Sequence, residues 1–381
     1  MLLSLTFSLP CRCCLSRQRL SFGITKKSCF SIDKLGIKLY KQGKIKNKGV
    51  NMKKLIFILL VLPILVGTVF AETLATLTGI MKPTNIYIDD RQIYVMENRT
   101  FFIYSLQDFK LKKKFGKEGE GPQEFKGMAH LIPLADYLLI NSAGKISYFT
   151  TNGDFIKEMK SPTGFTSSRF YPLDNGFVGR GSIQEQGILY GTINFFDEHL
   201  EKGKELYRMK STLQPDGKIE MLKQPFLYKT YKNKVYVAGK PGFIIDILDH
   251  TGKLLLSIDQ KYEKVKFTGD DEKKVRNALR LLYKQQYEEL KHRLAFPGYY
   301  PEIGDFQVTD NKIYVFTWKV GNGSNEWFVY DLQGKLLKRL FVPLVFMMPL
   351  EPFPYTVNNG KLYQLIESED EQWELHANEI N

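Results

Sequence analysis

Histidine is the residue type in this chain best suited to bind a metal or transfer a proton. The five histidines are His130, His199, His250, His292 and His376. They form no close pair and no HExxH motif, whereas a metal site needs three or more ligands that converge. The sequence therefore predicts no metal site and no other cofactor.

A glycine-rich stretch at residues 114–125 is the second place where chemistry is conceivable. Gly116 and Gly121 have the spacing of a phosphate-binding loop, but Pro122 stands where lysine is needed. Two glutamates in the stretch would also repel phosphate. Ser324 lacks the following glycine of a nucleophile elbow. No catalytic residue is predicted, and binding becomes the leading hypothesis.

The elements that must position any binding residues are short strands that recur along the chain. An aromatic or apolar centre returns six times, mostly after a polar turn, at residues 93–95, 137–139, 176–178, 235–237, 313–315 and 362–364. Successive centres lie 39 to 59 residues apart, except for one interval of 78 that contains a separate segment. A four-stranded propeller blade has this length.

A hairpin downstream of the centre supports the same unit. Residues 149–155, 247–254 and 329–336 are three versions of it, each with Gly at the turn, where a tight hairpin needs a positive φ. A two-sheet sandwich also has many short strands and is the alternative. The repeat favours an all-β fold, a six-bladed β-propeller with one inserted amphipathic helix between blades four and five.

The glycine-rich stretch resembles the loop between blades of NHL-repeat propellers and of exported bacterial six-bladed propellers of the TolB-like group. Phe115-Gly116, Gly121-Pro122 and Glu124-Phe125 carry the resemblance, and Gln123 replaces the usual glycine. The resemblance implies the fold of residues 74–381. An NHL-type lyase would hold zinc with histidines from several blades, and only His130 can be placed near the channel.

The two ends of this body are expected to share one blade. Residues 355–381 supply about three strands, and residues 74–80 can supply the fourth. Such closure removes open sheet edges.

An amphipathic helix is predicted at about residues 270–296. Apolar residues recur there at three- and four-residue spacing, Asp270 or Asp271 can cap the start, and Pro297-Gly298 ends the helix. A helix packed on the propeller surface is one interpretation, and a lid or partner-docking helix is the other.

The face that carries the glycine-rich stretch and this helix is predicted to bind a ligand. In an up-and-down blade, the connection to the next blade and the loop between the second and third strands emerge on one face. Loops on a rigid scaffold are common binding sites. The binding candidates expected on these second-to-third-strand loops are Glu97, Arg99, Arg180, Lys240, Trp318 and Lys319. Ordinary solvated surface is the alternative for each of them.

The charge of +13 suggests a nucleic-acid partner, but its distribution excludes one. Residues 1–51 contain eleven Lys and Arg against one acid, Asp33, so that almost all of the net charge precedes Leu55. All four cysteines also lie there. A nearly neutral, cysteine-free body suits an oxidising compartment and has no general attraction to DNA or RNA.

Residues 52–71 have the pattern of a signal peptide. Met52-Lys53-Lys54 precedes an apolar run that ends at Ala71, a small residue suited to cleavage. A membrane anchor is the alternative. Residues 1–51 are interpreted as a mis-called N-terminal extension, with an organellar presequence as the other possibility. Met52 then becomes the start, and the mature protein is expected to be periplasmic or secreted, without a stable membrane span.

The resulting hypothesis is an exported, non-enzymatic propeller that binds an unknown protein, peptide or glycan. The competing hypothesis is a propeller enzyme, a lyase or hydrolase that acts on peptide or glycan at the channel mouth.

Overall fold

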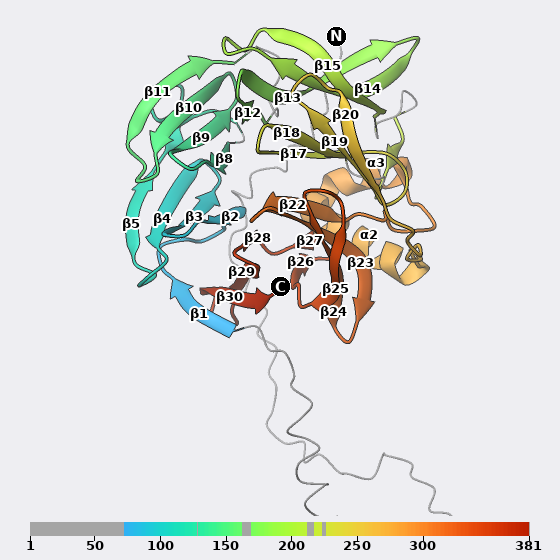
Figure 1. Cartoon of the computed structure of the whole chain (residues 1–381). Helices are drawn as coiled ribbons and strands as arrows, with labels where there is room; N and C mark the ends of the chain where they lie inside the picture. The colour runs from blue at the N-terminus through green and yellow to red at the C-terminus, as the bar shows by residue number, and fades with distance from the viewer. Residues whose placement is uncertain (1–71, 128, 162–168, 212–216, 223–225, 381) are drawn as a thin grey trace, which may run out of the picture. The chain divides into compact units, whose positions relative to one another are not determined.

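The described part of the chain is a six-bladed β-propeller (Figure 1). The computed structural model describes residues 72–127, 129–161, 169–211, 217–222 and 226–380. The predicted extension at residues 1–51 and the predicted signal peptide at residues 52–71 lie outside the described residues. Each blade is an antiparallel sheet of four strands, and the chain passes through each blade from the axis outward.

The first three blades follow one another directly along the chain. Blade 1 consists of β2 (Asn85–Ile88), β3 (Gln92–Glu97), β4 (Thr100–Ser105) and β5 (Leu111–Phe115). Blade 2 consists of β8 (His130–Pro133), β9 (Tyr137–Ser142), β10 (Lys145–Thr150) and β11 (Phe155–Lys160). Blade 3 consists of β12 (Tyr171–Leu173), β13 (Gly176–Glu185), β14 (Ile188–Phe196) and β15 (Lys202–Lys210).

The last three blades include the helical insertion and the joined chain ends. Blade 4 consists of β17 (Leu227–Tyr231), β18 (Lys234–Ala238), β19 (Ile244–Asp249) and β20 (Leu254–Asp259). Blade 5 consists of β22 (Asp305–Thr309), β23 (Lys312–Gly321), β24 (Ser324–Asp331) and β25 (Leu336–Val342). Blade 6 consists of β28 (Tyr355–Asn358), β29 (Lys361–Glu367), β30 (Trp373–Glu379) and β1 (Glu72–Leu77).

The second strand of every blade carries one of the six repeated centres, which confirms the repeat. β3, β9, β13, β18, β23 and β29 each contain one. The three predicted hairpins are the turns between the third and fourth strands of blades 2, 4 and 5. In blade 5, Gly334 has φ +79°, and an added Cβ would lie 2.9 Å from Leu256 of blade 4. Glycine is therefore needed both for the turn and for close blade packing.

The described apolar core divides by blade interface. One cluster of buried side chains joins each pair of neighbouring blades, and blade 6 packs on blade 1 in the same way. Both faces of each sheet are thus covered, because a blade lies between two others. This packing fixes the inner strands around one axis.

The closing strand β1 lies where the sequence predicts it. β1 pairs with β30, from Glu72 opposite Ala377 to Leu77 opposite Trp373. Leu77 is 2% exposed and Trp373 is 4% exposed, so the joint between the chain ends is part of the core.

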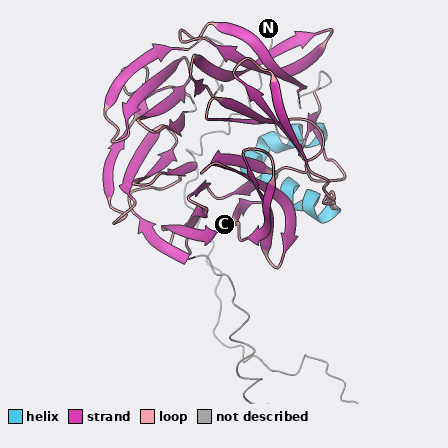
Figure 2. Ribbon diagram, in the orientation of Figure 1, coloured by secondary structure: helices cyan, strands magenta, loops and turns pink. Residues whose placement is uncertain are grey.

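The inserted helix exists but is broken, and its cap differs from the prediction (Figure 2). The N-cap is Thr268, whose hydroxyl accepts from the Asp271 N–H while Asp271 caps in return. An acid was predicted at the cap, but a capping box needs Ser or Thr at the cap and an acid at the third helical position. Lys284, at φ 47°, interrupts the helix. The segment comprises α2 (Gly269–Tyr283), η2 (Lys284–Gln286), α3 (Tyr287–Leu290) and η3 (Lys291–Arg293), and so ends before Pro297.

Short two-stranded pairs complete the connections between blades. They are β6 (Lys117–Glu118) with β7 (Glu124–Phe125), β16 (Ile219–Glu220) with β21 (Leu294–Ala295), and β26 (Phe346–Met348) with β27 (Glu351–Pro352). In the glycine-rich loop, Glu124 accepts from the Gly121 N–H at 2.9 Å, and Phe125 is fully buried. Gln123 has φ 63°, the left-handed conformation that favours the usual glycine.

Candidate binding site at the propeller axis

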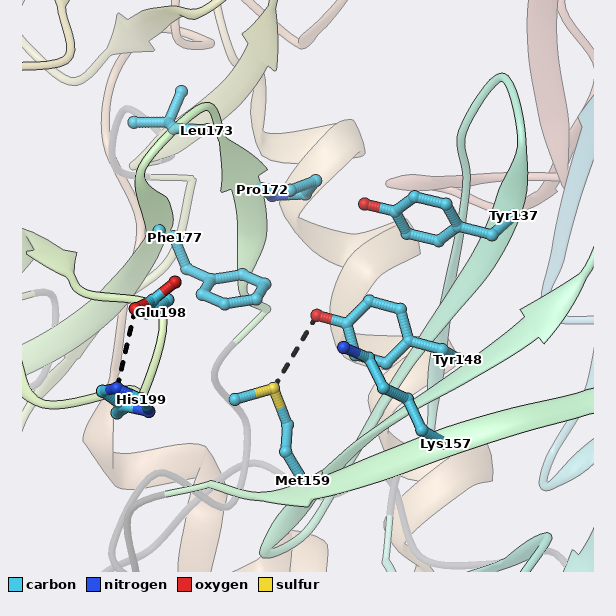
Figure 3. A pocket seen from close by; sticks show the side chains of 10 residues that line it. Tyr137, Tyr148, Lys157, Met159, Pro172, Leu173, Phe177, Glu198 and His199 are labelled. Carbon is cyan, nitrogen blue, oxygen red and sulfur yellow. Dashed lines mark hydrogen bonds and ion pairs between the residues drawn. The ribbon is translucent and has the colours of Figure 1, made fainter.

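A pocket of about 450 Å³ lies between blades 2 and 3 (Figure 3). Tyr137 and Tyr148 form one wall, with ring centroids 5.4 Å apart, and the Lys157 ammonium lies 4.9 Å from the Tyr148 ring. The highly exposed Glu198 and His199 lie at its edge, with Oε1 and Nε2 3.6 Å apart. The pocket lies on the face opposite the predicted binding face, because turns between first and second and between third and fourth strands line it. Glu198 is exposed to solvent and the Lys157 ammonium lies over the Tyr148 ring, so this pocket is a weak candidate for a ligand site.

Glu97 and Arg99, at the predicted loop of blade 1, hold neighbouring loops in place. The Glu97 carboxylate accepts from the backbone N–H groups of Met81 and Lys82 at 3.2 and 2.9 Å. Arg99 donates to the Gly127 carbonyl at 2.8 Å and pairs with Glu118 at 3.1 Å. Both side chains thus connect blade 1 to the loops that enter and leave it.

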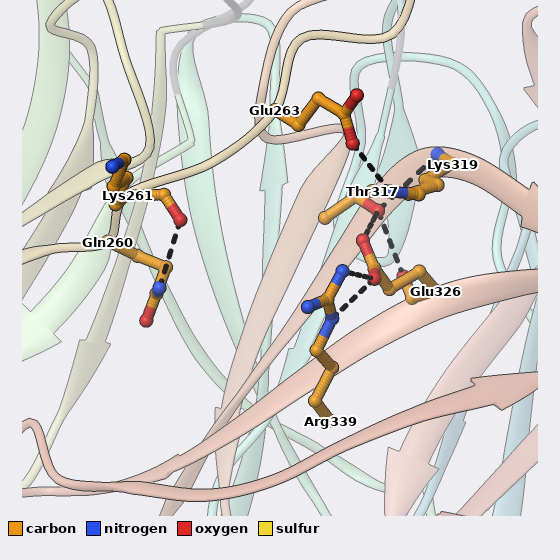
Figure 4. Close-up of polar contacts among 7 residues, drawn as sticks. All are labelled: Gln260, Lys261, Glu263, Thr317, Lys319, Glu326 and Arg339. Atoms are coloured by element: carbon orange, nitrogen blue, oxygen red, sulfur yellow. Dashed lines mark hydrogen bonds and ion pairs between the residues drawn. The ribbon is translucent and has the colours of Figure 1, made fainter.

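Lys240 and Lys319 also have partners within their own region. Lys240 pairs at 2.7 Å with Asp246, whose side chain is almost fully buried. Lys319 pairs with the exposed Glu263 at 3.1 Å (Figure 4). Beside it, the fully buried Glu326 forms an ion pair with Arg339 and accepts from the Thr317 hydroxyl. These contacts stiffen blades 4 and 5.

Arg180, Trp318 and Lys319 lie inside strands, not in the loops where they were predicted. The strands β13, β14, β23 and β24 have 10, 9, 10 and 8 residues, so these two hairpins extend well beyond the short first strands of their blades. Trp318 packs between Tyr300 and Phe346, with centroids 5.2 and 5.9 Å away. The Arg180 guanidinium lies 5.3 Å from the Phe226 ring. The six predicted residues therefore do not form one cluster.

A different set of side chains does converge, around the propeller axis. Each lies on or just before an innermost strand, and each is partly exposed. This axial cluster consists of Tyr87, Arg169, Tyr171, Lys229, Asp305 and Tyr355. Its members come from blades 1, 3, 4, 5 and 6.

Direct contacts hold several members of the cluster in place. The Tyr355 hydroxyl donates to Asp305 Oδ2 at 2.7 Å, which links blades 6 and 5. Tyr171 packs edge-on against Tyr228, with centroids 5.3 Å apart, and the Tyr228 hydroxyl donates to the Arg169 carbonyl. The backbone at Phe170 is fixed by Asn141 of blade 2, which accepts from its N–H at 3.0 Å.

The pKa of Tyr87 depends on charged and polar side chains from the other side of the propeller axis. Burial, followed by Tyr171, raises the pKa of Tyr87, while Arg169 and Lys229 lower it. Tyr87 belongs to blade 1, whereas Tyr171 and Lys229 belong to blades 3 and 4, which are not its neighbours. Side chains of non-neighbouring blades can influence one another this strongly only around the axis.

Within the cluster, Lys229 stays charged and Tyr355 stays protonated. Burial alone would lower the pKa of Lys229, but Tyr171 and Asp305 outweigh it and the pKa is raised. Burial and then Asp305 raise the pKa of Tyr355 well above its ordinary value. The site therefore presents cations together with tyrosine hydroxyl donors at neutral pH.

His130 lies at the edge of this cluster and is neutral. Burial, and then the charge of Arg169, lower its pKa to about 3. It is 7% exposed, and its Nδ1 has no hydrogen-bond partner. Among the described residues, no group of three or more His, Cys, Asp and Glu side chains could hold a metal ion.

The axial cluster was missed in the sequence because the repeat was identified on the second strands. The first strands face the axis, and their signal is a polar residue where an inner strand is otherwise apolar. Lys229, between Tyr228 and Thr230, and Asp305, before Phe306, show this signal. Of the predicted residues, only Arg180 reaches the cluster, since its pKa is lowered by burial and then influenced by Tyr228 and Arg169.

Comparisons with known proteins bear on the fold. No protein-family model and no curated protein matches the chain in sequence. A protein of Bacteroides fragilis NCTC 9343, described as a candidate exported protein, matches with a TM-score of 0.52 at 12% identity, over 82% of this chain and 95% of that one. A Bacteroides vulgatus member of the DUF4221 family gives a TM-score of 0.42 at 12% identity, over 81% and 96%. At such identities the likeness shows the fold alone.

No helix in the described ranges has both the length and the apolar character that a membrane crossing requires.

Proposed function

We propose that the protein is an exported, non-enzymatic β-propeller that binds a ligand at its axis. The observation that carries the proposal is the axial cluster, in which polar side chains of five blades converge while each keeps some solvent exposure. Ligand sites of propellers and other closed β folds commonly lie where strands meet around an axis. Three of the six members, Tyr171, Asp305 and Tyr355, begin an inner strand, so the ligand is expected on the face that carries the glycine-rich loop and the helix.

The rim of this face shapes the approach to the site. Four of the predicted residues contact the loops between blades: Glu97, Arg99, Trp318 and Lys319. Lys240 pairs with Asp246 within blade 4, and the Arg180 guanidinium lies beside the cluster. Three cluster members are tyrosines, whose rings can pack on a sugar or a peptide side chain. A glycan or peptide therefore fits this surface.

Export rests on the sequence pattern of residues 52–71, which predicts cleavage after Ala71. Cleavage there would leave β1, Glu72–Leu77, whole. We expect N-terminal sequencing of the protein from its native envelope fraction to begin at or near Glu72; a chain that retains residues 1–51 would contradict export from Met52.

The binding test uses the chain from Glu72 with soluble glycans and peptides. Candidate ligands are selected by their effect on Tm, and the contact region is then mapped by amide hydrogen exchange. Protection on β12, β17 and β22 is the expected result. Ligands that protect only the outer strands, or the pocket between blades 2 and 3, would refute binding at the axis.

A further inference from the structure

The inserted helix α2 carries a run of positive charge on its exposed side. From residue 273 to residue 287 the chain contains five Lys and Arg and no acid. Arg276 pairs with Glu272 at 2.7 Å, and the other four side chains are exposed. These four, which we call the basic stripe, are Lys273, Lys274, Arg280 and Lys284.

Helical spacing explains why these cations share one side. Lys273 and Arg280 are seven residues apart, which is two helical turns, so they lie one above the other. Lys274 is beside Lys273 in the same turn, and Lys284 is the C-cap at which α2 ends. The basic stripe therefore runs from the second turn of α2 to its C-terminus.

The opposite side of α2 packs on protein. Val275 is 4% exposed, and Leu279 and Tyr283 pack against an apolar cluster that contains Ile219 and Tyr287. Figure 2 shows the inserted helices at the edge of the propeller. The fold thus anchors one side of α2 and leaves the side with the basic stripe open to solvent.

The basic stripe is not neutralised within the part of the chain that the structure describes. No ion pair there involves any of its four cations. The acids near its two ends are engaged elsewhere, because Asp271 caps the helix at Thr268 and Glu288 pairs with Lys291. Asp270, exposed in the first turn, is the acid that remains beside four positive charges.

Helix stability does not explain this arrangement. Arg280 and Lys284 are four residues apart, a spacing at which like charges repel each other. An acid at either position would stabilise the helix better, as Glu272 does with Arg276. The charge of the basic stripe instead suits an anionic surface outside the molecule.

Leu281 indicates which kind of anionic surface this is. It follows Arg280 on the exposed side of α2 and is itself 75% exposed. At a lipid surface, cations meet the anionic headgroups while an apolar side chain enters the boundary of the acyl region. Lipid headgroups also move to meet flexible lysines, whereas the carboxylates of a folded acidic protein are fixed.

We propose that α2 docks the propeller on an anionic lipid surface, with the basic stripe on the phosphate groups and Leu281 in the headgroup boundary. The attraction is mainly electrostatic, because most of the apolar side of α2 is already packed on protein. This role goes beyond the proposed ligand binding at the axis and uses none of the residues of the axial cluster.

The first experiment measures sedimentation of the chain from Glu72 with lipid vesicles. Vesicles that contain about one third phosphatidylglycerol in phosphatidylcholine are expected to bind it at least tenfold more strongly than vesicles of phosphatidylcholine alone. Raising NaCl from about 50 mM to about 300 mM is expected to weaken this binding at least fivefold. Equal binding to both kinds of vesicle would overturn the proposal.

The second experiment removes charge from the basic stripe. The double variants Lys273→Gln with Lys274→Gln, and Arg280→Gln with Lys284→Gln, are each expected to weaken binding to the anionic vesicles by about tenfold or more. Leu281→Ala, which keeps a good helix former, is expected to weaken it about threefold. All of these positions are exposed, so Tm should stay within about 2 °C of the original.

The matched control is Lys253→Gln with Lys335→Gln. It removes the same charge from exposed turns of blades 4 and 5, and vesicle binding should stay within about twofold of the original. If this control weakens binding as much as the variants of the basic stripe do, net charge and not α2 is responsible, and the proposal is wrong.

An acidic protein is the competing occupant, and soluble poly-L-glutamate is its probe. A chain that binds poly-L-glutamate through the basic stripe but does not sediment with anionic vesicles would assign the stripe to an acidic protein and refute the membrane. Binding to vesicles that poly-L-glutamate at equal charge concentration does not abolish is the result expected for a lipid surface.

Discussion

Gln123 occupies a position of the glycine-rich loop where related loops usually have glycine. It has φ 63°, and its side chain is exposed in the glycine-rich loop. A non-glycine residue in this left-handed region carries a backbone cost that glycine does not. We expect Gln123→Gly to raise the free energy of unfolding by about 0.5–1 kcal/mol, measured by urea denaturation.

The control for this prediction is Gln123→Ala, which removes the side chain but keeps the backbone cost. It should leave the free energy of unfolding within about 0.5 kcal/mol of the original. An equal gain in both variants would mean that the Gln123 side chain, not its backbone, is responsible.

His130 couples stability to pH. Its pKa is about 3 in the folded protein because of burial and the charge of Arg169, whereas an unfolded histidine titrates near 6.5. The unfolded state therefore binds more protons between these values, and stability falls as pH falls below 6.5. From pH 7 to pH 5 the expected loss from this residue is about 2 kcal/mol.

The measurement is urea denaturation of the original chain and of His130→Gln at both pH values. The variant should lose about 2 kcal/mol less than the original over this interval, whatever its stability at pH 7. His199→Gln, at an exposed position, should retain the original pH dependence. An unchanged pH dependence in His130→Gln would show that His130 is protonated without unfolding.

The axial residues also show where sequence reasoning reaches its limit. Tyr87 and Lys229 are 142 positions apart, and nothing local in the sequence relates them. Their proximity follows only from the closure of all six blades. Trp318 illustrates the opposite error, because an aromatic residue near a strand end was taken as a binding candidate, whereas it packs on Tyr300 and Phe346.

At the scale of elements, strands β24 and β25 are joined by a buried ion pair. The Glu326 side chain is fully buried, and Arg339 Nε and Nη2 each lie 2.6 Å from its Oε1. Removing the arginine would leave a buried carboxylate without its cation, although it still accepts from the Thr317 hydroxyl. We expect Arg339→Met to lower the free energy of unfolding by about 2 kcal/mol, less than for a fully enclosed pair because Arg339 is half exposed.

Two matched variants test this explanation. Lys338→Met removes an exposed charge from the same strand, and Lys319→Met breaks the exposed pair with Glu263. Each should change the free energy of unfolding by less than about 0.5 kcal/mol. If all three variants change the free energy of unfolding equally, the burial of Glu326 does not explain how the pair stabilises the protein.

Elements were predicted well where a local pattern encodes them. The second strands and the Gly turns follow from alternation and turn chemistry, and the inserted helix follows from its apolar stripe. Its break at Lys284 was not predicted, because the stripe continues through Tyr287 and Leu290, which pack into one cluster with Tyr283. The N-cap is Thr268, one residue before the helix begins at Gly269. The prediction placed the cap on Asp270 or Asp271 instead, because aspartate is a common cap residue.

At the scale of the whole molecule, the propeller depends on β1 to close blade 6. A chain that begins at Thr78 would expose the edge of β30 and lose the buried Leu77. We expect its Tm to fall by about 5 °C or more relative to the chain from Glu72, with oligomers in size-exclusion chromatography as free edges pair. A monomeric truncated chain with unchanged Tm would show that β1 does not stabilise the propeller.

The same strand sets the order of events in biosynthesis. Thr73 contacts His376, so the first strand of the propeller waits for the last before its blade exists. Pairing over such a separation is slow, and a partly made chain keeps an unpaired edge until synthesis is complete. A propeller that cannot fold completely before its last strand is made keeps the chain unfolded for longer. Passage through a narrow secretion channel requires an unfolded chain.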